Sequence, residues 1–341
     1  MSDTCTPWDG ILLTTAALAL GGLGLATLGT TPLGPVDRGW ADGTYQRGYE
    51  NRFEEALPTA QSAAQLFAAL KLALLGEAAE GAILGSDGWL FTAEEFSAPI
   101  ETRDLTSELL RVRAMLGSGT ALLPVIIPDK ARIMAEMLAR SRSGPFTARY
   151  DAALESIEAV GLPALDLRPA LDAAGTPFLR TDTHWSPAGA EAAAAEVGAA
   201  VAKHGPDLTK AKSALTATGV VPFEGDLRAF VDTGHWIALA SVPVERIETF
   251  RTEITTQGGL FGDAPVEIVL VGTSFSARAE FHFEGFLKHH LSADVLNLAQ
   301  VGLGPFVPMD HALAALERLP TPPRLIIWEV PERYLALSQH P

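Results

Sequence analysis

Two side chains of one short segment have the types and the spacing of a catalytic acid and base. In Thr181-Asp182-Thr183-His184, a carboxylate and an imidazole lie two residues apart, and residues at that spacing in an extended segment project to the same side. Asp182 could then fix the tautomer of His184 and stabilise the imidazolium that forms when the ring accepts a proton. The same pattern suits a surface ion pair or two metal ligands, although no second histidine or carboxylate cluster lies nearby in sequence to complete a metal site.

A serine that could act as the nucleophile follows an apolar run. Ile268-Val269-Leu270-Val271 leads into Gly272-Thr273-Ser274, and a helical region is expected over residues 277–289. The start of a helix offers unpaired N–H groups and a positive end, which can stabilise an oxyanion while the serine attacks. Ser274 could also be a plain helix N-cap. Together with Asp182 and His184, however, it completes a set of nucleophile, base and orienting acid, so we predict a catalytic triad.

The elements that must position these residues follow an α/β pattern. Short apolar runs alternate with helix-length amphipathic or alanine-rich segments, which predicts a parallel sheet covered by helices on both faces. A Ser186-Pro187 pair is typical of a helix start, so it should fix one end of the Asp182 loop. The predicted strands are residues 121–127, 162–167, 266–271, 293–298 and 324–330, and the predicted helices are residues 106–116, 147–160, 188–203 and 309–319.

Two further stretches have their own patterns. Residues 82–91 read as strand, tight turn and strand around Gly85-Ser86-Asp87-Gly88. Residues 213–262 show mixed strand and turn signals with little periodicity, and we interpret them as an insertion that shapes a substrate groove.

Composition excludes several classes of protein. The 341 residues carry a formal net charge of −16, which argues against nucleic acid as the main ligand because phosphate binding requires a surplus of lysine and arginine. The single cysteine, Cys5, excludes an intrachain disulfide and a cysteine-rich metal site. Neither a P-loop motif nor a G-x-G-x-x-G motif after a strand is present, so we predict no cofactor and no resident metal.

The N-terminal region predicts a membrane anchor. Residues 11–33 contain no charged side chain, and about 20 apolar residues span a bilayer core. The run is longer than a secretory h-region and lacks a clean cleavage site, which favours an uncleaved anchor over a signal. We therefore divide the chain into an anchor or signal (1–33), a linker with two short helices interrupted at Pro58 (34–80) and a catalytic domain (81–341).

As a set, the motifs resemble the alginate O-acetyltransferase family of the AlgJ and AlgX types. The resemblance rests on Asp182-Thr183-His184-Trp185 followed by Gly272-Thr273-Ser274-Phe275-Ser276. Three further segments match in order: Gly85-Ser86-Asp87-Gly88-Trp89-Leu90-Phe91, Ile127-Pro128-Asp129-Lys130 and Trp328-Glu329-Val330-Pro331-Glu332-Arg333-Tyr334. It implies an SGNH-hydrolase-like fold that is circularly permuted, because the Asp/His block precedes the nucleophile block instead of following it.

The resemblance also implies roles for individual residues. Ser274 corresponds to the nucleophile, His184 to the base and Asp182 to its partner. The segment 297–304 resembles a glycine block that donates an oxyanion N–H, for which we choose Gly302 beside the N–H of Ser274, with Gly304 as the alternative. Arg333 is a candidate third donor or substrate ligand, or else an ion-pair partner of Glu329 or Glu332. Trp185 and Lys130 are candidate substrate-binding residues, with a core position and a solvated charge as the respective alternatives.

The function that the resemblance implies is transfer of acetyl groups to an exopolysaccharide. The expected intermediate is an acetyl-serine, the acceptor is alginate or another cell-surface glycan, and the donor arrives through a membrane-bound O-acyltransferase partner. The expected location is the periplasmic face of the inner membrane, with the chain held by its N-terminal helix. An acetylesterase of the same fold and a non-catalytic scaffold of an exopolysaccharide complex are the alternatives.

Overall fold

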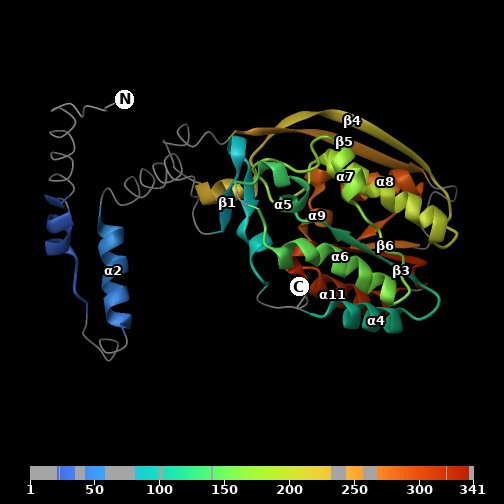
Figure 1. Ribbon diagram of the computed structural model, residues 1–341, viewed down its shortest axis with the longest axis horizontal. Coiled ribbons are helices and arrows are strands. Elements are labelled where there is room, and N and C mark those ends of the chain that lie inside the picture. The colour runs from blue at the N-terminus through green and yellow to red at the C-terminus, as the bar shows by residue number, and fades with distance from the viewer. Residues whose placement is uncertain are drawn as a thin grey trace. The chain divides into compact units, whose positions relative to one another are not determined.

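The computed structural model describes residues 21–22, 24–34, 43–57, 81–99, 103–139, 141–231, 243–255, 267–319 and 321–337. They belong to two units (Figure 1). The first contains a helical stretch at residues 24–30 and helix α2 (Thr44–Ala56). Arg52 of α2 donates hydrogen bonds to the carbonyl oxygens of Pro32 and Leu33, at 3.2 and 3.0 Å. The second unit holds β1 and all later described helices and strands.

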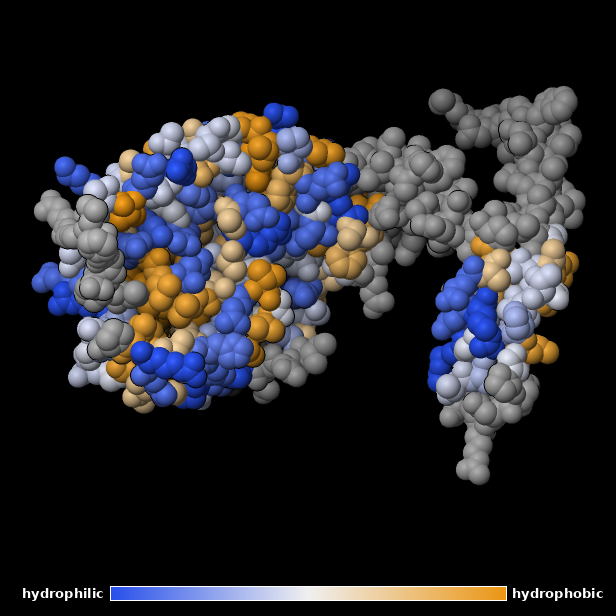
Figure 2. Space-filling model, turned by 180° about the vertical axis from the view of Figure 1, so that it is seen from behind, coloured by the Kyte–Doolittle hydropathy of each residue, from blue (hydrophilic) through white to orange (hydrophobic). Residues whose placement is uncertain are grey.

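The predicted membrane anchor lies partly outside the described residues, which omit 1–20 and 23. Among the residues that are described, no helix has both the length and the hydrophobicity to cross a bilayer. Leu25, Leu28 and Leu33 of the first unit are 74%, 54% and 66% exposed, and Figure 2 shows hydrophobic as well as hydrophilic surface on this unit. The second helix expected within residues 34–80 falls outside the description, and the predicted boundaries at 33 and 80 stay predictions.

The second unit is organised around a four-stranded parallel sheet in the order β3-β8-β6-β7. Its strands are β3 (Ala121–Ile127), β8 (Leu325–Pro331), β6 (Ile268–Val271) and β7 (Leu296–Asn297). All residues of β6 and β8 are buried, as expected for strands covered on both faces. The parallel sheet is thus confirmed. The strand predicted at residues 162–167 is wrong, because this stretch is irregular and Pro163 has no N–H to donate to a ladder.

Helices cover both faces of the sheet, and alternate strand residues face each layer. One face, with Val125, Leu270 and Ile327, packs on α8 (Pro187–His204) and α10 (Phe283–Leu291). The other face, with Ile126, Val269 and Ile326, packs on helices α4 (Leu105–Leu116), α6 (Gly144–Ala159) and α11 (Phe306–Leu316). Each fully buried aliphatic side chain contributes about 1.5–3 kcal/mol, so the strand ends that carry the site are held by a hydrophobic cluster on each face of the sheet. The predicted cover of helices on both faces of the sheet is confirmed (Figure 1).

Residues 213–262 contain most of an antiparallel ribbon that is separate from the parallel sheet. Strand β4 (Lys212–Phe223) pairs with β5 (Glu245–Thr255), with an irregularity between Ala217 and Gly219. The ribbon packs on α10, and a short 3₁₀ helix (Asp226–Val231) follows β4. The predicted insertion therefore has a regular form that its sequence did not reveal.

The remaining elements are short. Strands β1 (Ala82–Leu84) and β2 (Leu90–Thr92) flank a 3₁₀ turn at Ser86–Gly88, as predicted. The helix expected at residues 277–289 is broken instead: α9 (Ser274–Ala277) and α10 are separated by a 3₁₀ turn and by His282, whose φ of 58° cannot continue a right-handed helix. The other short elements are α5 (Lys130–Ile133), α7 (Arg168–Ala173) and the 3₁₀ turns Ala93–Phe96, Ala135–Met137, Ala279–Phe281 and Glu332–Tyr334.

Candidate active site

The fold brings Ser274, His184 and Asp182 into one hydrogen-bonded chain. Ser274 Oγ lies 2.7 Å from Nε2 of His184, and Nδ1 of the same ring lies 2.6 Å from Asp182 Oδ1. Asp182 is fully buried and His184 is 4% exposed. The His184 ring also stacks on Phe281, with ring centroids 5.0 Å apart. The predicted juxtaposition is therefore present, with each nitrogen of the imidazole facing a different partner.

Hydrogen bonds keep the buried Asp182 carboxyl ionised. Burial by itself would raise its pKa, but the hydrogen bonds and the attraction from His184 outweigh that effect, and the pKa is lowered. Oδ1 accepts from the backbone N–H of His184 at 2.9 Å, and Oδ2 accepts from that of Asp226 at 2.9 Å. A charged Asp182 can stabilise a protonated His184, which is what transient proton transfer from Ser274 requires.

The turn that carries Ser274 is fixed by a buried glutamate on the neighbouring strand. Glu329 of β8 is fully buried and accepts from Thr273 N at 2.7 Å, from Thr273 Oγ1 at 3.0 Å and from Ser276 Oγ at 3.0 Å. A Cβ at Gly272 would lie 2.4 Å from Glu329 Oε2, so only glycine lets β6 approach this carboxyl. Burial raises the Glu329 pKa to about 7, against the hydrogen bonds from Thr273 and Ser276 that lower it.

Lys130 is not a substrate ligand, which corrects our prediction. The side chain is 1% exposed, and Nζ donates to three backbone carbonyls: Leu90, Arg180 at 3.1 Å and Asp182 at 2.9 Å. Burial lowers the Lys130 pKa to about 8, although nearby carboxylates raise it. The ammonium therefore ties the loop that carries the acid and base to β2.

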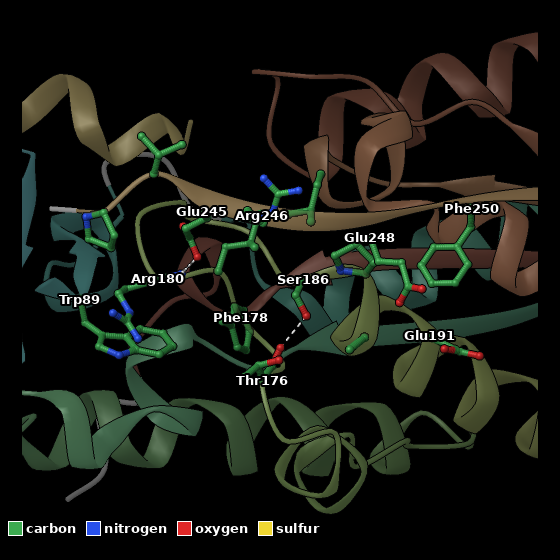
Figure 3. A pocket seen from close by; sticks show the side chains of 16 residues that line it. Trp89, Thr176, Phe178, Arg180, Ser186, Glu191, Glu245, Arg246, Glu248 and Phe250 are labelled. Atoms are coloured by element: carbon green, nitrogen blue, oxygen red, sulfur yellow. Dashed lines mark hydrogen bonds between the residues drawn. The ribbon is translucent and has the colours of Figure 1, made fainter. Parts of the chain in front are cut away.

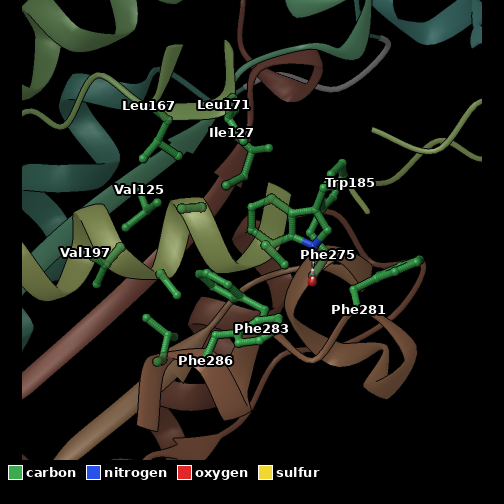
Figure 4. Packing of buried hydrophobic residues seen from close by; sticks show 14 of the residues in the cluster. Val125, Ile127, Leu167, Leu171, Trp185, Val197, Phe275, Phe281, Phe283 and Phe286 are labelled. Carbon is green, nitrogen blue, oxygen red and sulfur yellow. Dashed lines mark hydrogen bonds between the residues drawn. The ribbon is translucent and has the colours of Figure 1, made fainter. Parts of the chain in front are cut away.

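Trp185 is also not available to a substrate. Its side chain is fully buried, its indole N–H donates to the carbonyl oxygen of Phe275 at 3.2 Å, and its ring packs edge-on against Phe275 at 5.2 Å (Figure 4). Trp185 thus takes the core alternative. It links the His184 loop to the Ser274 turn, since each residue neighbours one member of the triad.

The segment 297–304, which contains the candidate oxyanion glycines, contacts the turn that carries Ser274. The N–H of Gln300 donates to the carbonyl oxygen of Gly272 at 3.0 Å, two residues before Ser274. Gly302 and Gly304 have positive φ values of 78° and 63°, a conformation that glycine adopts without strain. The oxyanion role of Gly302, beside the Ser274 N–H, stays a prediction.

Arg333 pairs with a glutamate that sequence reasoning did not single out. Its Nε donates to Glu94 Oε2 at 2.9 Å, not to Glu329 or Glu332, and the guanidinium lies 5.4 Å from the centroid of the Phe275 ring. The side chain is only 6% exposed. Arg333 is therefore adjacent to the nucleophile turn, and its proposed contact with substrate stays a prediction.

Two carboxylates in or next to the ribbon, both missed in the sequence, hold the same loop. Glu245 at the start of β5 accepts from the N–H groups of Arg180 and Thr181 at 2.6 and 2.7 Å. Asp226, just after β4, accepts from the N–H of Thr183 at 2.7 Å. Because β4 and β5 have no motif that marks these positions, only the tertiary structure reveals them.

The described residues include one group with metal-ligand chemistry at the site. Ligand atoms of Asp182, His184 and Asp226 lie within 4.8 Å of one another. Asp182 Oδ1 and both ring nitrogens of His184 are already engaged within the triad, and Asp226 Oδ1 is engaged by Thr183. The geometry is therefore that of a proton-transfer chain.

A cavity of about 490 Å³ is lined by residues next to the Asp182–His184 loop, among them Arg180 and Ser186 (Figure 3). It runs between the start of α8 and β5, and its wall includes Trp89, Arg180, Glu245 and Arg246. None of the triad residues lines it. The cavity is connected to the triad only indirectly: Glu245 lines the cavity and also accepts hydrogen bonds from the Asp182–His184 loop.

The fold and the triad define a class. A parallel sheet covered on both faces, with a serine after one strand and an Asp-x-His loop beside it, is the arrangement of an SGNH-hydrolase-like serine enzyme. The arrangement can form and break an ester at Ser274, because the imidazole can accept the hydroxyl proton and return it.

Comparison with known proteins identifies the family. The family model described as "SGNH hydrolase-like domain, acetyltransferase AlgX" matches residues 82–332. A protein of Pseudomonas syringae pv. tomato described as "probable alginate O-acetylase AlgJ" is 34% identical over 309 residues, covering 86% of this chain and 79% of the relative. The protein of the same description from Pseudomonas aeruginosa is 33% identical and covers 97% of this chain and 88% of the relative. The solved O-acetyltransferase domain of Pseudomonas putida AlgJ superposes with a TM-score of 0.66 at 31% identity, covering 74% of this chain and 91% of that one. The chain belongs to the AlgX family of SGNH hydrolase-like acetyltransferases.

Proposed function

We propose that this chain is a serine-dependent O-acetyltransferase that acetylates hydroxyl groups of an exopolysaccharide of the alginate kind. The observation that carries the proposal is the chain of contacts from Ser274 Oγ through the His184 ring to Asp182, at 2.7 and 2.6 Å. The relatives described as probable alginate O-acetylases support acetyl as the transferred group and an alginate-like polysaccharide as the acceptor.

In the first half-reaction, Ser274 Oγ attacks the carbonyl carbon of an acetyl ester while His184 Nε2 accepts the hydroxyl proton. The tetrahedral oxyanion is stabilised by backbone N–H groups, for which Ser274 and Gly302 are our candidates; each such donor contributes about 10²–10³-fold. His184 returns the proton to the departing alcohol, and an acetyl-serine remains. The buried, ionised Asp182 stabilises the imidazolium throughout.

In the second half-reaction, His184 removes the proton from a sugar hydroxyl, whose oxygen attacks the acetyl-serine carbonyl. Collapse of the second tetrahedral intermediate breaks the bond to Ser274 Oγ, which regains its proton from His184. General acid–base catalysis of this type contributes about 10²–10⁴-fold. Water in place of the sugar would give hydrolysis, so acceptor binding decides between transferase and esterase.

The test compares the wild-type protein with Ser274→Ala and with Ser118→Ala as a matched control. Ser118 is exposed in the segment that precedes β3. Each protein is incubated with an activated acetyl ester and a mannuronate oligosaccharide, and acetylated sugar and free acetate are measured by mass spectrometry. We expect acetylated sugar from wild type and Ser118→Ala and none from Ser274→Ala. Full turnover by Ser274→Ala would refute the assignment, and acetate without acetylated sugar would identify an esterase.

We also propose that residues 11–33 anchor the chain in the inner membrane with the catalytic unit on the periplasmic side, where a membrane-bound O-acyltransferase partner delivers the acetyl group. The uncharged run and the exposure of Leu25, Leu28 and Leu33 support an apolar environment for this segment. The position of Asp182 and His184 before Ser274 supports a circular permutation of the SGNH-like fold. Fractionation of cells that express the full chain, with and without residues 11–33, tests the anchor: recovery of both forms in the soluble periplasmic fraction would contradict it.

A further inference from the structure

A short segment after β4 crosses the backbone of the Asp182–His184 loop at close range. A Cβ at Gly225 would lie 2.1 Å from the carbonyl oxygen of Thr181 and 2.6 Å from the nitrogen of Asp182. A glycine is therefore required at this position for the two segments of backbone to approach this closely. The next residues continue the contact, since the N–H of Leu227 donates to the carbonyl oxygen of Thr181 at 3.2 Å.

Asp226 bonds to the loop through both its backbone and its side chain. Its N–H donates to Asp182 Oδ2 at 2.9 Å. Its Oδ1 accepts from the N–H of Thr183 at 2.7 Å and from Thr183 Oγ1 at 3.1 Å. Together with the bond from Leu227, these contacts give polar groups on both sides of Asp182 a partner, as buried backbone requires.

Asp226 also places a second carboxylate next to His184. Its Oδ2 lies 3.6 Å from His184 Nδ1, the nitrogen that bonds Asp182 at 2.6 Å. Burial and the charge of Asp182 raise the Asp226 pKa, while His184 and Thr183 lower it. The side chain is 39% exposed, so it can be changed without opening the core.

We infer that Asp226 is a positioning residue of the proposed triad: it holds Asp182 and Thr183 in place and supports the charge of a protonated His184 as a second carboxylate. This inference rests on the proposed function, because it assigns Asp226 a part in the proton transfer from Ser274. It connects the ribbon to the proposed triad, since Asp226 begins the 3₁₀ helix that follows β4.

The test measures three quantities for Asp226→Ala, Asp226→Asn and the control Glu224→Ala. They are kcat and KM for transfer to the oligosaccharide, the rate at which a sulfonyl fluoride labels Ser274, and the midpoint of urea unfolding. Glu224 is exposed two residues earlier on the same segment. We expect Asp226→Ala to lower kcat and the labelling rate in parallel, by about 10- to 100-fold, with little change in KM. Asp226→Asn should lose less, because its amide oxygen can still accept from Thr183.

A cycle with Asp182→Asn separates positioning from an independent effect. If Asp226 acts through Asp182 and His184, the double variant Asp182→Asn/Asp226→Ala should be far less impaired than the product of the two single effects. Multiplicative effects, or unchanged labelling of Ser274 in Asp226→Ala, would overturn the inference. Absence of labelling in the wild-type protein would instead contradict the proposed function, so the two failures are distinguishable. If Asp226→Ala fails to fold, Asp226→Asn carries the same comparison.

Discussion

Replacement of Glu329 by glutamine should change how stability depends on pH. The carboxyl is fully buried, and burial raises its pKa from 4.5 to about 7. A rise of this size corresponds to a free energy of unfolding that is lower by about 3 kcal/mol when the group is ionised than when it is protonated. Because the folded pKa lies above the unfolded value, the associated stability is fully present below pH 4.5 and is lost as the pH rises through 7. A glutamine at this position does not titrate.

The assay is urea unfolding followed by tryptophan fluorescence at several pH values between 4.5 and 8.5, and Trp185 and Trp328 are both fully buried reporters. The free energy of unfolding of wild type, relative to Glu329→Gln, should fall by about 3 kcal/mol across this range. Any constant cost of the amide beside Thr273 cancels from this slope. The exposed Glu317 provides the control, since Glu317→Gln should follow the wild-type curve. Parallel pH curves for wild type and Glu329→Gln would refute the argument that this buried carboxyl ionises near neutral pH.

Three further substitutions test the supports of the site. Gly272→Ala places a Cβ 2.4 Å from Glu329 Oε2 and should lower the free energy of unfolding by about 1–3 kcal/mol; an unchanged urea midpoint would contradict the close approach. Lys130→Met keeps the apolar stem but leaves carbonyls of the loop without their donor. It should cost about 1–3 kcal/mol for each carbonyl left unsatisfied and slow sulfonyl fluoride labelling of Ser274, whereas unchanged labelling would show that the loop does not need the ammonium. Asp182→Asn should reduce kcat about 10⁴-fold through the wrong tautomer of His184 with little change in the urea midpoint, and a kcat within tenfold of wild type would exclude Asp182 as the orienting acid.

Local sequence pattern was sufficient to predict an element where the residues of that segment alone determine its structure. The runs in β3 and β6 are apolar throughout, and that of β8 is apolar except at Glu329, which is what strands covered on both faces require. The Ser186-Pro187 pair starts α8, with Ser186 Oγ accepting from Gly189 N at 3.2 Å. The Asp182-x-His184 spacing likewise placed both side chains together, because alternate residues of an extended segment share a side. Local pattern failed at residues 162–167, where hydrophobicity was present but the stretch is irregular and Pro163 has no N–H to donate to a ladder.

The sequence by itself determined the class of fold and the identity of the three reactive groups, since these depend on residue type and on short-range spacing. The tertiary structure decided which polar residues support them. Lys130 reads as a surface charge, but it is buried and its ammonium donates to loop carbonyls. Glu245 begins strand β5 and Asp226 begins the 3₁₀ helix after β4, and neither position has a distinctive pattern. Those roles depend on hydrogen bonds between residues about 40 to 65 positions apart, and a pairing over such distances is created only when the chain packs.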